Sequence, residues 1–464
     1  MAEETTTGHL RRVRVVVVGG GSRQWVPTLA CDLATAPSLR SMDLVLHDIE
    51  PARCEVTVRY CELVAAARGL DWGVAVEADR RTALRDADYV LVSVTAGGRA
   101  ALHGDIAINA RYGIRSPKAD TASPAGIARG VRAARVLHAI ARDVREVAPG
   151  AWLINVTNPM AMSCRAALLA HDRVVGLCDA LPGTELWLGA VLRADPARIR
   201  MEVAGTNHLP LVVGGTAGDE PLFEALERAL ADEAWMSTVL GRMPDPDVDG
   251  SLVVPGGLGR SPLAGRDLCV RDLLDDWQVS LHLWRTTGVL GGAGDEHTAE
   301  LLPGYDCSQW NVHVRTGADY DAGELRFTRE LERRLAEEDV PSWRSAERVV
   351  TFIEGHLGGP TQRIPVNVAN GAQQALGVDA DAVVESYATV TPAGIALEAP
   401  VALPEEMVAR TQRAADSQDA AVRFALHDEP DALHDALVAD PTTDLLRPTE
   451  LGALHRDLLT HLAR

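Results

Sequence analysis

The stretch Arg12-Val13-Arg14-Val15-Val16-Val17-Val18-Gly19-Gly20-Gly21-Ser22 sets the pattern around which the rest of the chain is arranged. Its run of β-branched residues predicts a buried strand, and the glycines that follow predict a tight turn. Apolar residues then recur at helical spacing, at Trp25, Leu29 and Leu33. Strand, glycine turn and helix in this order predict the start of a nucleotide-binding α/β unit.

A second apolar run, at residues 44–46, leads to Asp48, 29 residues after the first glycine. An acid at the end of the second strand accepts hydrogen bonds from the ribose hydroxyls in dinucleotide-binding units. Its charge would repel the additional phosphate of NADP, so Asp48 favours NAD. The helix N-terminus would hold the pyrophosphate, and the turn would be lined by Gly19, Gly21 and Ser22. Gln24 occupies the third glycine position of the usual motif, so an ordinary glycine turn is the alternative.

Strands and helices continue to alternate downstream. Strands are predicted at 74–77, 89–94 and 152–156, and helices at 52–68 and 125–147. The strand at 89–94 runs into small residues, of which Thr95 and Gly97 would contact the cofactor. The alternation predicts an α/β fold with a Rossmann-type, doubly wound parallel sheet in a domain of residues 1–190. A second α/β domain, residues 191–464, would bind substrate and mediate assembly, similar to the lactate and malate dehydrogenases.

In the second half of the chain, the predicted strands and helices no longer alternate regularly. Helices are predicted at 221–242, 267–290 and 323–338, a loop at 243–266, and strands at 366–369 and 382–390. Amphipathic helices follow at 404–440, and their apolar faces would pack against the core or a partner subunit.

Composition argues against several classes of function. The chain has 464 residues, 47% of them hydrophobic, and a formal net charge of −20. This charge argues against nucleic acid or an anionic membrane surface as a partner, because both need basic patches. No apolar run is long enough to span a bilayer, and residues 1–9 lack the apolar segment of a secretion signal. Seven cysteines at irregular spacings do not form a disulfide framework, which predicts a reduced, cytoplasmic protein.

Two apolar runs end in residues that bind metals. Residues 174–177 run into Cys178 and Asp179, and a later run ends in Gly205-Thr206-Asn207-His208. If both are strands that end at the same edge of a sheet, Cys178 and His208 would hold a divalent metal. Two protein ligands are fewer than structural zinc sites use, so substrate and water would complete a catalytic site. The alternatives are a buried core cysteine and a turn-capping histidine. Asp179 would be a general acid, a further ligand or a solvated loop acid.

Other polar residues follow predicted strands or precede predicted helices. Asn158 would bind substrate hydroxyls or cap the following helix, and Asp120 has the same capping alternative. Asp295-Glu296-His297 lies in a glycine-rich segment that also suits an exposed turn. Arg129 and Arg132 lie about one helical turn apart, so they either face water or reach an anionic group.

Five groups of motifs form a joint pattern along nearly the whole chain. They are Gly19-Gly20-Gly21-Ser22 with His47-Asp48-Ile49; Tyr112-Gly113-Ile114-Arg115 with Ala119-Asp120-Thr121 and residues 126–132; Asn158-Pro159-Met160-Ala161-Met162; Val175-Gly176-Leu177-Cys178; and Ala204-Gly205-Thr206-Asn207-His208. In this order the chain resembles glycoside hydrolase family 4, most closely its α-galactosidase and α-galacturonidase branch. Each motif is modest, and their joint occurrence is specific.

The resemblance implies NAD as a catalytic cofactor and a divalent metal, usually Mn²⁺, held by Cys178 and His208. It implies a glycosidase that oxidises C3 of a small α-glycoside, eliminates across C1 and C2, adds water and reduces C3 again. Asn158 and Asn207 would bind the sugar, and Asp179 would help the leaving group depart. The resemblance also implies a homodimer or homotetramer.

The chain departs from the family pattern at several places. One glycine is missing from residues 122–126, and Ala107 stands near Asp105 where the family has glutamate. The family uses Tyr or Asp as the base at C2; Asp295 is predicted for this role, with Tyr305 second. One alternative function on the same scaffold is an NAD-dependent sugar dehydrogenase or epimerase, and another is a nucleotide sensor with a decayed site.

Overall fold

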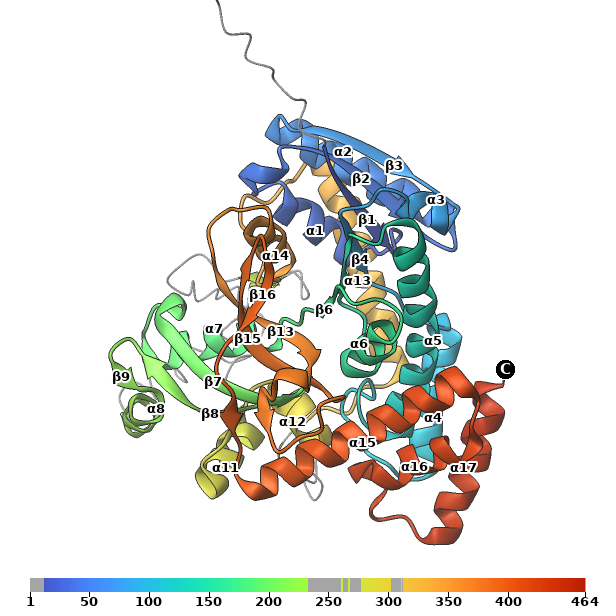
Figure 1. The fold of residues 1–464 in the computed structure, drawn as a ribbon, viewed down its shortest axis with the longest axis vertical. Helices are drawn as coiled ribbons and strands as arrows, with labels where there is room; N and C mark the ends of the chain where they lie inside the picture. Colours follow the sequence, from blue (N-terminus) through green and yellow to red (C-terminus); the bar gives the residue numbers. More distant parts are fainter. Residues whose placement is uncertain are drawn as a thin grey trace, which may run out of the picture.

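A nine-stranded sheet lies at the centre of the molecule (Figure 1). The computed structural model describes residues 12–232, 260–261, 266–267, 277–301, 310 and 312–463. Six neighbouring strands are parallel, in the order β3-β2-β1-β4-β5-β6. Their bounds are β1 (Val13–Val18), β2 (Ser41–His47), β3 (Asp71–Val76), β4 (Tyr89–Val92), β5 (Trp152–Asn155) and β6 (Val174–Gly176). The chain moves outward from β1 in both directions, and in doubly wound sheets ligands bind where the order reverses, here at the carboxyl ends of β1 and β4. The predicted Rossmann-type sheet is therefore confirmed.

At β1 both faces of this sheet are covered, which explains the continuous apolar run of that strand. Val15 and Val17 belong to a core cluster with α1 (Trp25–Leu33) and α2 (Cys54–Arg68). Val16 and Val18 belong to the opposite cluster, with α5 (Ser123–Val147). Because successive side chains of a strand point to opposite faces, only a strand covered on both sides buries four consecutive valines.

Three strands from the second half of the chain extend the same sheet beyond β6. They are β13 (Arg363–Ala369), β15 (Val383–Thr391) and β16 (Gly394–Leu397), and all pair antiparallel with their neighbours. The strands predicted at 366–369 and 382–390 are thus confirmed. The sheet crosses the division predicted at residue 190, and the boundaries 1–190 and 191–464 stay a prediction.

A second, antiparallel sheet carries the hairpin that forms part of the candidate site. It consists of β7 (Ile199–Thr206), β8 (Leu209–Ala217), β9 (Glu220–Pro221) and β12 (Leu290–Gly291). One hydrophobic cluster joins this sheet to α7 (Ala180–Leu192), α8 (Leu222–Ala231) and α11 (Gln278–Thr287). This second layer lies beside the extension of the main sheet (Figure 1).

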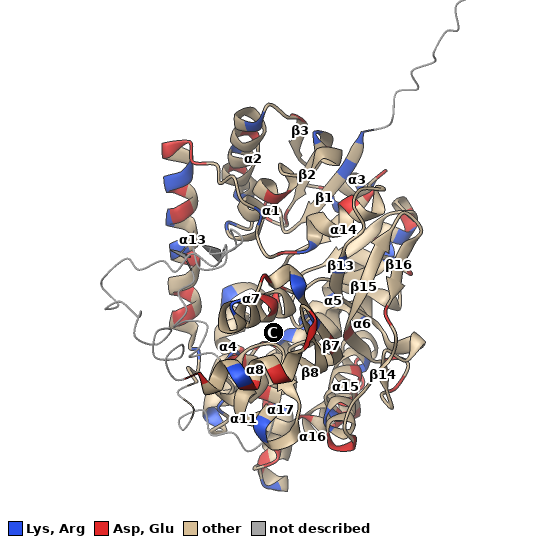
Figure 2. Ribbon diagram, turned by 90° about the vertical axis from the view of Figure 1, so that its left-hand side faces the viewer, with Lys and Arg blue, Asp and Glu red and all other residues tan. Residues whose placement is uncertain are grey.

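The remaining helices cover the sheets and the outer faces of the molecule. They are α3 (Arg80–Leu84), α4 (Gly98–Arg111), α6 (Met160–Leu168), α12 (Asp295–Leu301), α13 (Gly317–Glu337), α14 (Val349–His356), α15 (Glu405–His427), α16 (Pro430–Ala439) and α17 (Pro448–Leu462). Two short strand pairs complete the fold: β10 (Arg260–Ser261) with β11 (Arg266–Asp267), and β14 (Ala375–Leu376) with β17 (Val401–Ala402). The amphipathic helices predicted at 404–440 are α15 and α16, which share a buried cluster with α5. Along α13 acidic and basic residues alternate (Figure 2), and Arg333 pairs there with Glu330 at 2.9 Å.

The structure describes only part of three predicted segments, residues 221–242, 243–266 and 267–290. The helix predicted at 221–242 is α8, which ends at Ala231, and the loop predicted at 243–266 lies mostly outside the described residues. Of the helix predicted at 267–290, α11 covers Gln278–Thr287, Asp267 is paired to Arg260 in a strand, and residues 268–276 lie outside the described residues. Within the described part of the chain, the cysteines are free and buried, and no helix is long and apolar enough to cross a membrane.

Candidate active site

The site begins with a hairpin whose turn is Asn207-His208, between β7 and β8. His208 has a φ of +68°, a region that non-glycine residues seldom adopt, and its side chain is 2% exposed. Such a conformation costs on the order of 1–3 kcal/mol and persists only where the surroundings hold it. Cys178 follows β6 of the main sheet, so the prediction that both residues end strands of one sheet edge is wrong. The hairpin nevertheless approaches the end of β6, because the Asn207 amide interacts with the Cys178 thiol.

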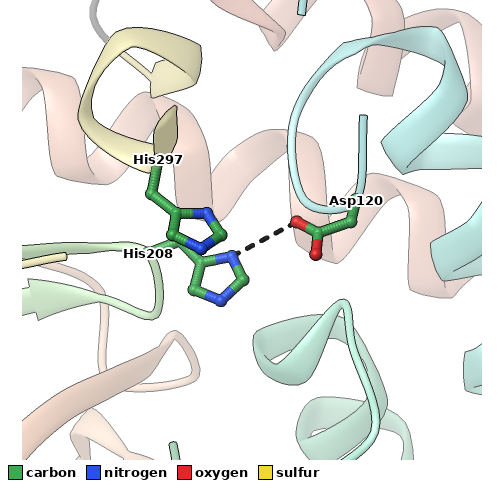
Figure 3. Close-up of side chains that lie close together, drawn as sticks. All are labelled: Asp120, His208 and His297. Carbon is green, nitrogen blue, oxygen red and sulfur yellow. Dashed lines mark ion pairs between the residues drawn. The ribbon is translucent and has the colours of Figure 1, made fainter. Parts of the chain in front are cut away.

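Three buried side chains from distant segments meet beside this hairpin (Figure 3). They are Asp120, from the loop between α4 and α5, His208 itself, and His297 of α12. One potential ligand atom of each lies within 4.8 Å of the others. The Asp120 Oδ1 atom is 3.4 Å from His208 Nδ1, and the two imidazole rings stack with centroids 3.6 Å apart. Asp120 thus faces the site and does not cap α5, and the exposed turn considered for 295–297 is wrong, because α12 is buried there.

Charged neighbours set the electrostatics of this cluster. Burial alone would raise the pKa of Asp120, but the imidazoles of His208 and His297 and the Arg129 guanidinium hold it well below its usual range. Burial, His208 and the Lys118 ammonium lower the pKa of His297. The Lys118 Nζ atom lies 2.9 Å from His297 Nε2. At neutral pH the cluster therefore contains an ionised Asp120 and an uncharged His297 ring.

Cys178 lies in an acidic, buried environment. Burial and the negative charges of Glu385 and Asp179 raise the pKa of the Cys178 thiol well above its usual value, and the bond from Asn207 lowers it. Burial also raises the pKa of Glu385, to about 7, while the hydrogen bond from Asn207 opposes this shift. Glu385 accepts from Asn207 Nδ2 at 3.3 Å and faces Asn367 across β13 and β15. Glu385 was not singled out from the sequence, because it lies more than 170 residues from the hairpin that it contacts.

The structure assigns different surroundings to the other predicted substrate-side residues. Asn158 follows β5 and is half-buried; its Oδ1 atom is enclosed and has no partner among the described residues, and it does not cap α6. Asp179 is half-buried, 3.9 Å from the Cys178 thiol. Asp295 is 1% exposed and accepts the N–H groups of Val279 and Ser280 at the start of α11, at 2.9 and 3.0 Å. Its observed contacts therefore anchor a helix, and its role as the C2 base stays a prediction.

The glycine turn after β1 is tied to the end of β2. Gly19 has a φ of +97°, and a Cβ atom there would lie 1.9 Å from the Ser93 carbonyl oxygen, so only glycine fits. Gly21 N–H donates to Asp48 Oδ2 at 3.0 Å, which fastens the turn to the second strand. The Ser22 hydroxyl accepts the N–H of Trp25 at 3.2 Å and thereby supports the first turn of α1.

A side chain of α5 fixes the loop after β4, which contains the exposed residues Thr95 and Gly97. Arg132 of α5 donates to the carbonyl of Ala96 at 3.2 Å and pairs with the buried Asp105. His461 of α17 contacts the other oxygen of Asp105, at 2.7 Å. Arg132 therefore reaches an anionic group, and the C-terminal helix contributes a contact that no local sequence signal indicated.

Comparison with known proteins agrees with this architecture. The model of the family 4 glycosyl hydrolases matches residues 14–193, and the model of the family 4 glycosyl hydrolase C-terminal domain matches residues 203–443. The chain belongs to glycosyl hydrolase family 4, as its motifs predicted. An α-galacturonidase of Bacillus subtilis is 25% identical over 97% of each chain. An α-galactosidase of Rhizobium meliloti is 26% identical over 92% of this chain and 84% of its own. A solved 6-phospho-α-glucosidase from gut microorganisms, in complex with NAD and Mn²⁺, has a TM-score of 0.77 at 18% identity, over 97% of both chains.

Proposed function

We propose that this hydrolase is an NAD- and divalent-metal-dependent enzyme that cleaves a small α-glycoside by oxidation at C3, elimination across C1 and C2, addition of water and reduction. One observation carries the proposal. The parallel strands β1, β4, β5 and β6 are neighbours in the sheet, and they lead into the Gly19 turn, the Thr95 loop, Asn158 and Cys178. Because parallel strands end at the same sheet edge, these four segments lie side by side, which supports a site shared by cofactor, sugar and metal.

The cofactor side of this site fits NAD. The turn at Gly19 has no room for a Cβ atom, as expected where backbone approaches a pyrophosphate. Asp48 is half-buried at the rim, and Ile49 beside it is 91% exposed, which offers an apolar surface to a base. Thr95 and Gly97 are exposed on the adjoining loop. The structural relative bound to NAD supports the same assignment.

The other side of the site fits a divalent cation such as Mn²⁺. The Cys178 thiolate and the His208 imidazole, with sugar or water oxygens, form a donor set that a divalent transition metal accepts. The positive charge of a metal would offset the carboxylates of Asp179 and Glu385, which otherwise raise the Cys178 pKa. The enclosed Oδ1 atoms of Asn158 and Asn207 have no partners among the described residues, as expected of groups that bind a sugar.

Each proposed role follows from this placement. When bound, NAD supplies reversible hydride transfer and the metal supplies charge stabilisation at the oxygen of C3. Asn158 and Asn207 orient the sugar hydroxyls, and Asp179 donates a proton to the departing oxygen. The relatives that act on α-galacturonides and α-galactosides support an α-linked substrate. We include a homodimer or homotetramer in the proposal, to be measured by light scattering on the purified protein.

The test uses nitrophenyl α-galactoside, α-glucoside and α-galacturonide with NAD, Mn²⁺ and a thiol reductant in heavy water. Release of nitrophenol that needs both NAD and metal, with deuterium at C2 of the sugar product, is expected. Cleavage that continues at the same rate after NAD and metal are removed would contradict the proposal. Net accumulation of NADH together with an oxidised sugar would favour the dehydrogenase alternative.

A further inference from the structure

A directional chain of hydrogen bonds leads from His208 to Asp120. The Thr121 hydroxyl oxygen lies 2.5 Å from His208 Nδ1, and the same hydroxyl donates to Asp120 Oδ1 at 3.1 Å. All three side chains are buried, so water does not compete for these bonds. Asp120 also lies 3.4 Å from His208 Nδ1 and 4.0 Å from the Arg129 guanidinium.

The direction of this chain determines the tautomer of His208. A carboxylate accepts hydrogen bonds and donates none, and a threonine hydroxyl has a single proton to give. Because that proton points to Asp120, the Thr121 oxygen must accept from His208, which places a proton on Nδ1. In the opposite tautomer the Thr121 hydroxyl would have to turn its proton to His208 Nδ1, which would lose the bond to Asp120 and leave its Oδ1 atom facing the Nδ1 lone pair at 3.4 Å. The neutral His208 ring therefore carries its lone pair on Nε2.

Alternatively, Asp120, His208 and His297 could all bind one metal ion, but the contact of His297 with Lys118 argues against this arrangement. An ammonium donates only, so Lys118 at 2.9 Å occupies the Nε2 lone pair of His297. The Thr121 and His208 contacts of Asp120 both go to its Oδ1 atom, and its Oδ2 atom faces the Arg129 guanidinium at 4.0 Å. Of the two imidazoles, only His208 therefore keeps a lone pair for a metal, on Nε2, and its ring stacks on that of His297 with centroids 3.6 Å apart.

We propose that Thr121 and Asp120 are positioning residues that hold His208 as the Nδ1–H tautomer and so present its Nε2 lone pair to the divalent metal. The inference rests on the proposed function, because it presumes that His208 binds the metal. Metal-binding histidines commonly donate their second N–H to an oxygen acceptor, which fixes the ring and raises the basicity of the ligand atom. Here a hydroxyl stands between the imidazole and the carboxylate.

The experiment measures Mn²⁺ affinity by calorimetry on the full-length protein without NAD or sugar. Thr121→Val keeps the side-chain shape and removes the hydroxyl, and it is expected to weaken Mn²⁺ binding about 10- to 100-fold, the usual range for such outer contacts. Thr121→Ser restores the hydroxyl and should bind within about 3-fold of the wild type by the same reasoning. NAD affinity serves as the control and should not change in either variant.

The outcomes separate this inference from the proposed function. If Thr121→Val binds Mn²⁺ like the wild type while His208→Ala does not bind it, the proposed role of the Thr121 hydroxyl, here called the hydroxyl relay, is wrong. The proposed metal site is then still supported. If Thr121→Ser is as weak as Thr121→Val, the relay is also wrong. If His208→Ala binds normally, the proposed metal site itself fails. Should the variants not fold, nitrogen NMR of histidine-labelled wild-type protein decides: a proton on Nε2 of metal-free His208 overturns the relay.

Discussion

The glycine turn and the proposed metal side of the candidate site are built in different ways. The turn takes its parts from residues 13–48 of the chain, and its main contacts are backbone hydrogen bonds such as Gly21 N–H to Asp48. The proposed metal side takes the buried cluster of Asp120, His208 and His297, together with Cys178, from four separate segments whose charges meet only in the fold. A local unit can be altered without loss of the distant one, whereas the assembled site depends on the whole fold.

The largest expected effect comes from removing a predicted metal ligand. Cys178→Ala and His208→Ala should each lower glycosidase activity by about 10³-fold, since metal stabilisation is worth several kcal/mol and each 1.4 kcal/mol is a factor of ten. NAD affinity should stay unchanged, because the turn at Gly19 is built separately. The measurements are nitrophenol release and NAD titration.

The matched control is Cys164→Ala. It removes another buried thiol, which lies on α6 in the same hydrophobic cluster as Cys178. It should retain activity, because Cys164 is not placed in the candidate site. An activity loss as large as that of Cys178→Ala would show that any cavity near β6 lowers activity. The effect of Cys178→Ala could then not be assigned to the loss of a metal ligand.

A smaller effect is expected at the turn itself. In Gly19→Ala the new Cβ would meet the Ser93 carbonyl oxygen at 1.9 Å, so the turn must shift. NAD affinity should fall by about 10-fold or more, because strain of roughly 1–3 kcal/mol is added where φ is positive. Mn²⁺ affinity should be kept. Gly150→Ala, with open space around it, is the control; equal losses of NAD affinity in both variants would refute the role of the turn.

The choice of cofactor should respond to Asp48. Asp48→Asn removes the negative charge that would face the 2′-phosphate of NADP and keeps a carbonyl to accept the Gly21 N–H. The ratio of NADP to NAD affinity should rise about 10-fold, as a charge repulsion of about 1–2 kcal/mol would give. Asp43→Asn, on the same strand but near its other end, should leave the ratio unchanged. An unchanged ratio in Asp48→Asn would place the ribose elsewhere.

The smallest effect is a change in the pH dependence of stability on the metal side. Burial and the charge of Asp120 raise the pKa of Glu300 to about 8, against the lowering effect of hydrogen bonds from Ser116, Ala119 and Lys118. The folded state then keeps a proton that the unfolded chain has lost, so stability falls as the pH rises from about 4 to about 8.

Glu300→Gln cannot ionise, so its melting temperature should fall by a few degrees less than that of the wild type across this pH window. The amide nitrogen can occupy the place of Oε2, which has no partner among the described residues. Glu332→Gln, exposed on α13, is the control and should follow the wild-type curve. Parallel curves for Glu300→Gln and wild type would mean that Glu300 ionises in the same way in both states.

Much of the first region could be predicted because its physics is local. Four consecutive valines before glycines specify a strand buried on both faces, and the glycines specify a turn that no side chain could occupy. The motifs also predicted that Cys178, His208 and Asn158 belong to one site, and this assignment stays a prediction. They did not show that His208 sits in the hairpin of a second sheet, or that Asp295 holds the start of α11.

The sequence by itself determined the Rossmann-type sheet, the family and the residue types of the site. Periodicity and turn chemistry act between residues that are near in the chain, so they can be read from it directly. Only the tertiary structure decided that Thr121 bridges His208 to Asp120. It also decided that Glu385 contacts Asn207 and that His461 contacts Asp105. These contacts join segments up to 356 residues apart. Their energies depend on burial and on charges that meet only after the sheets and helices have packed.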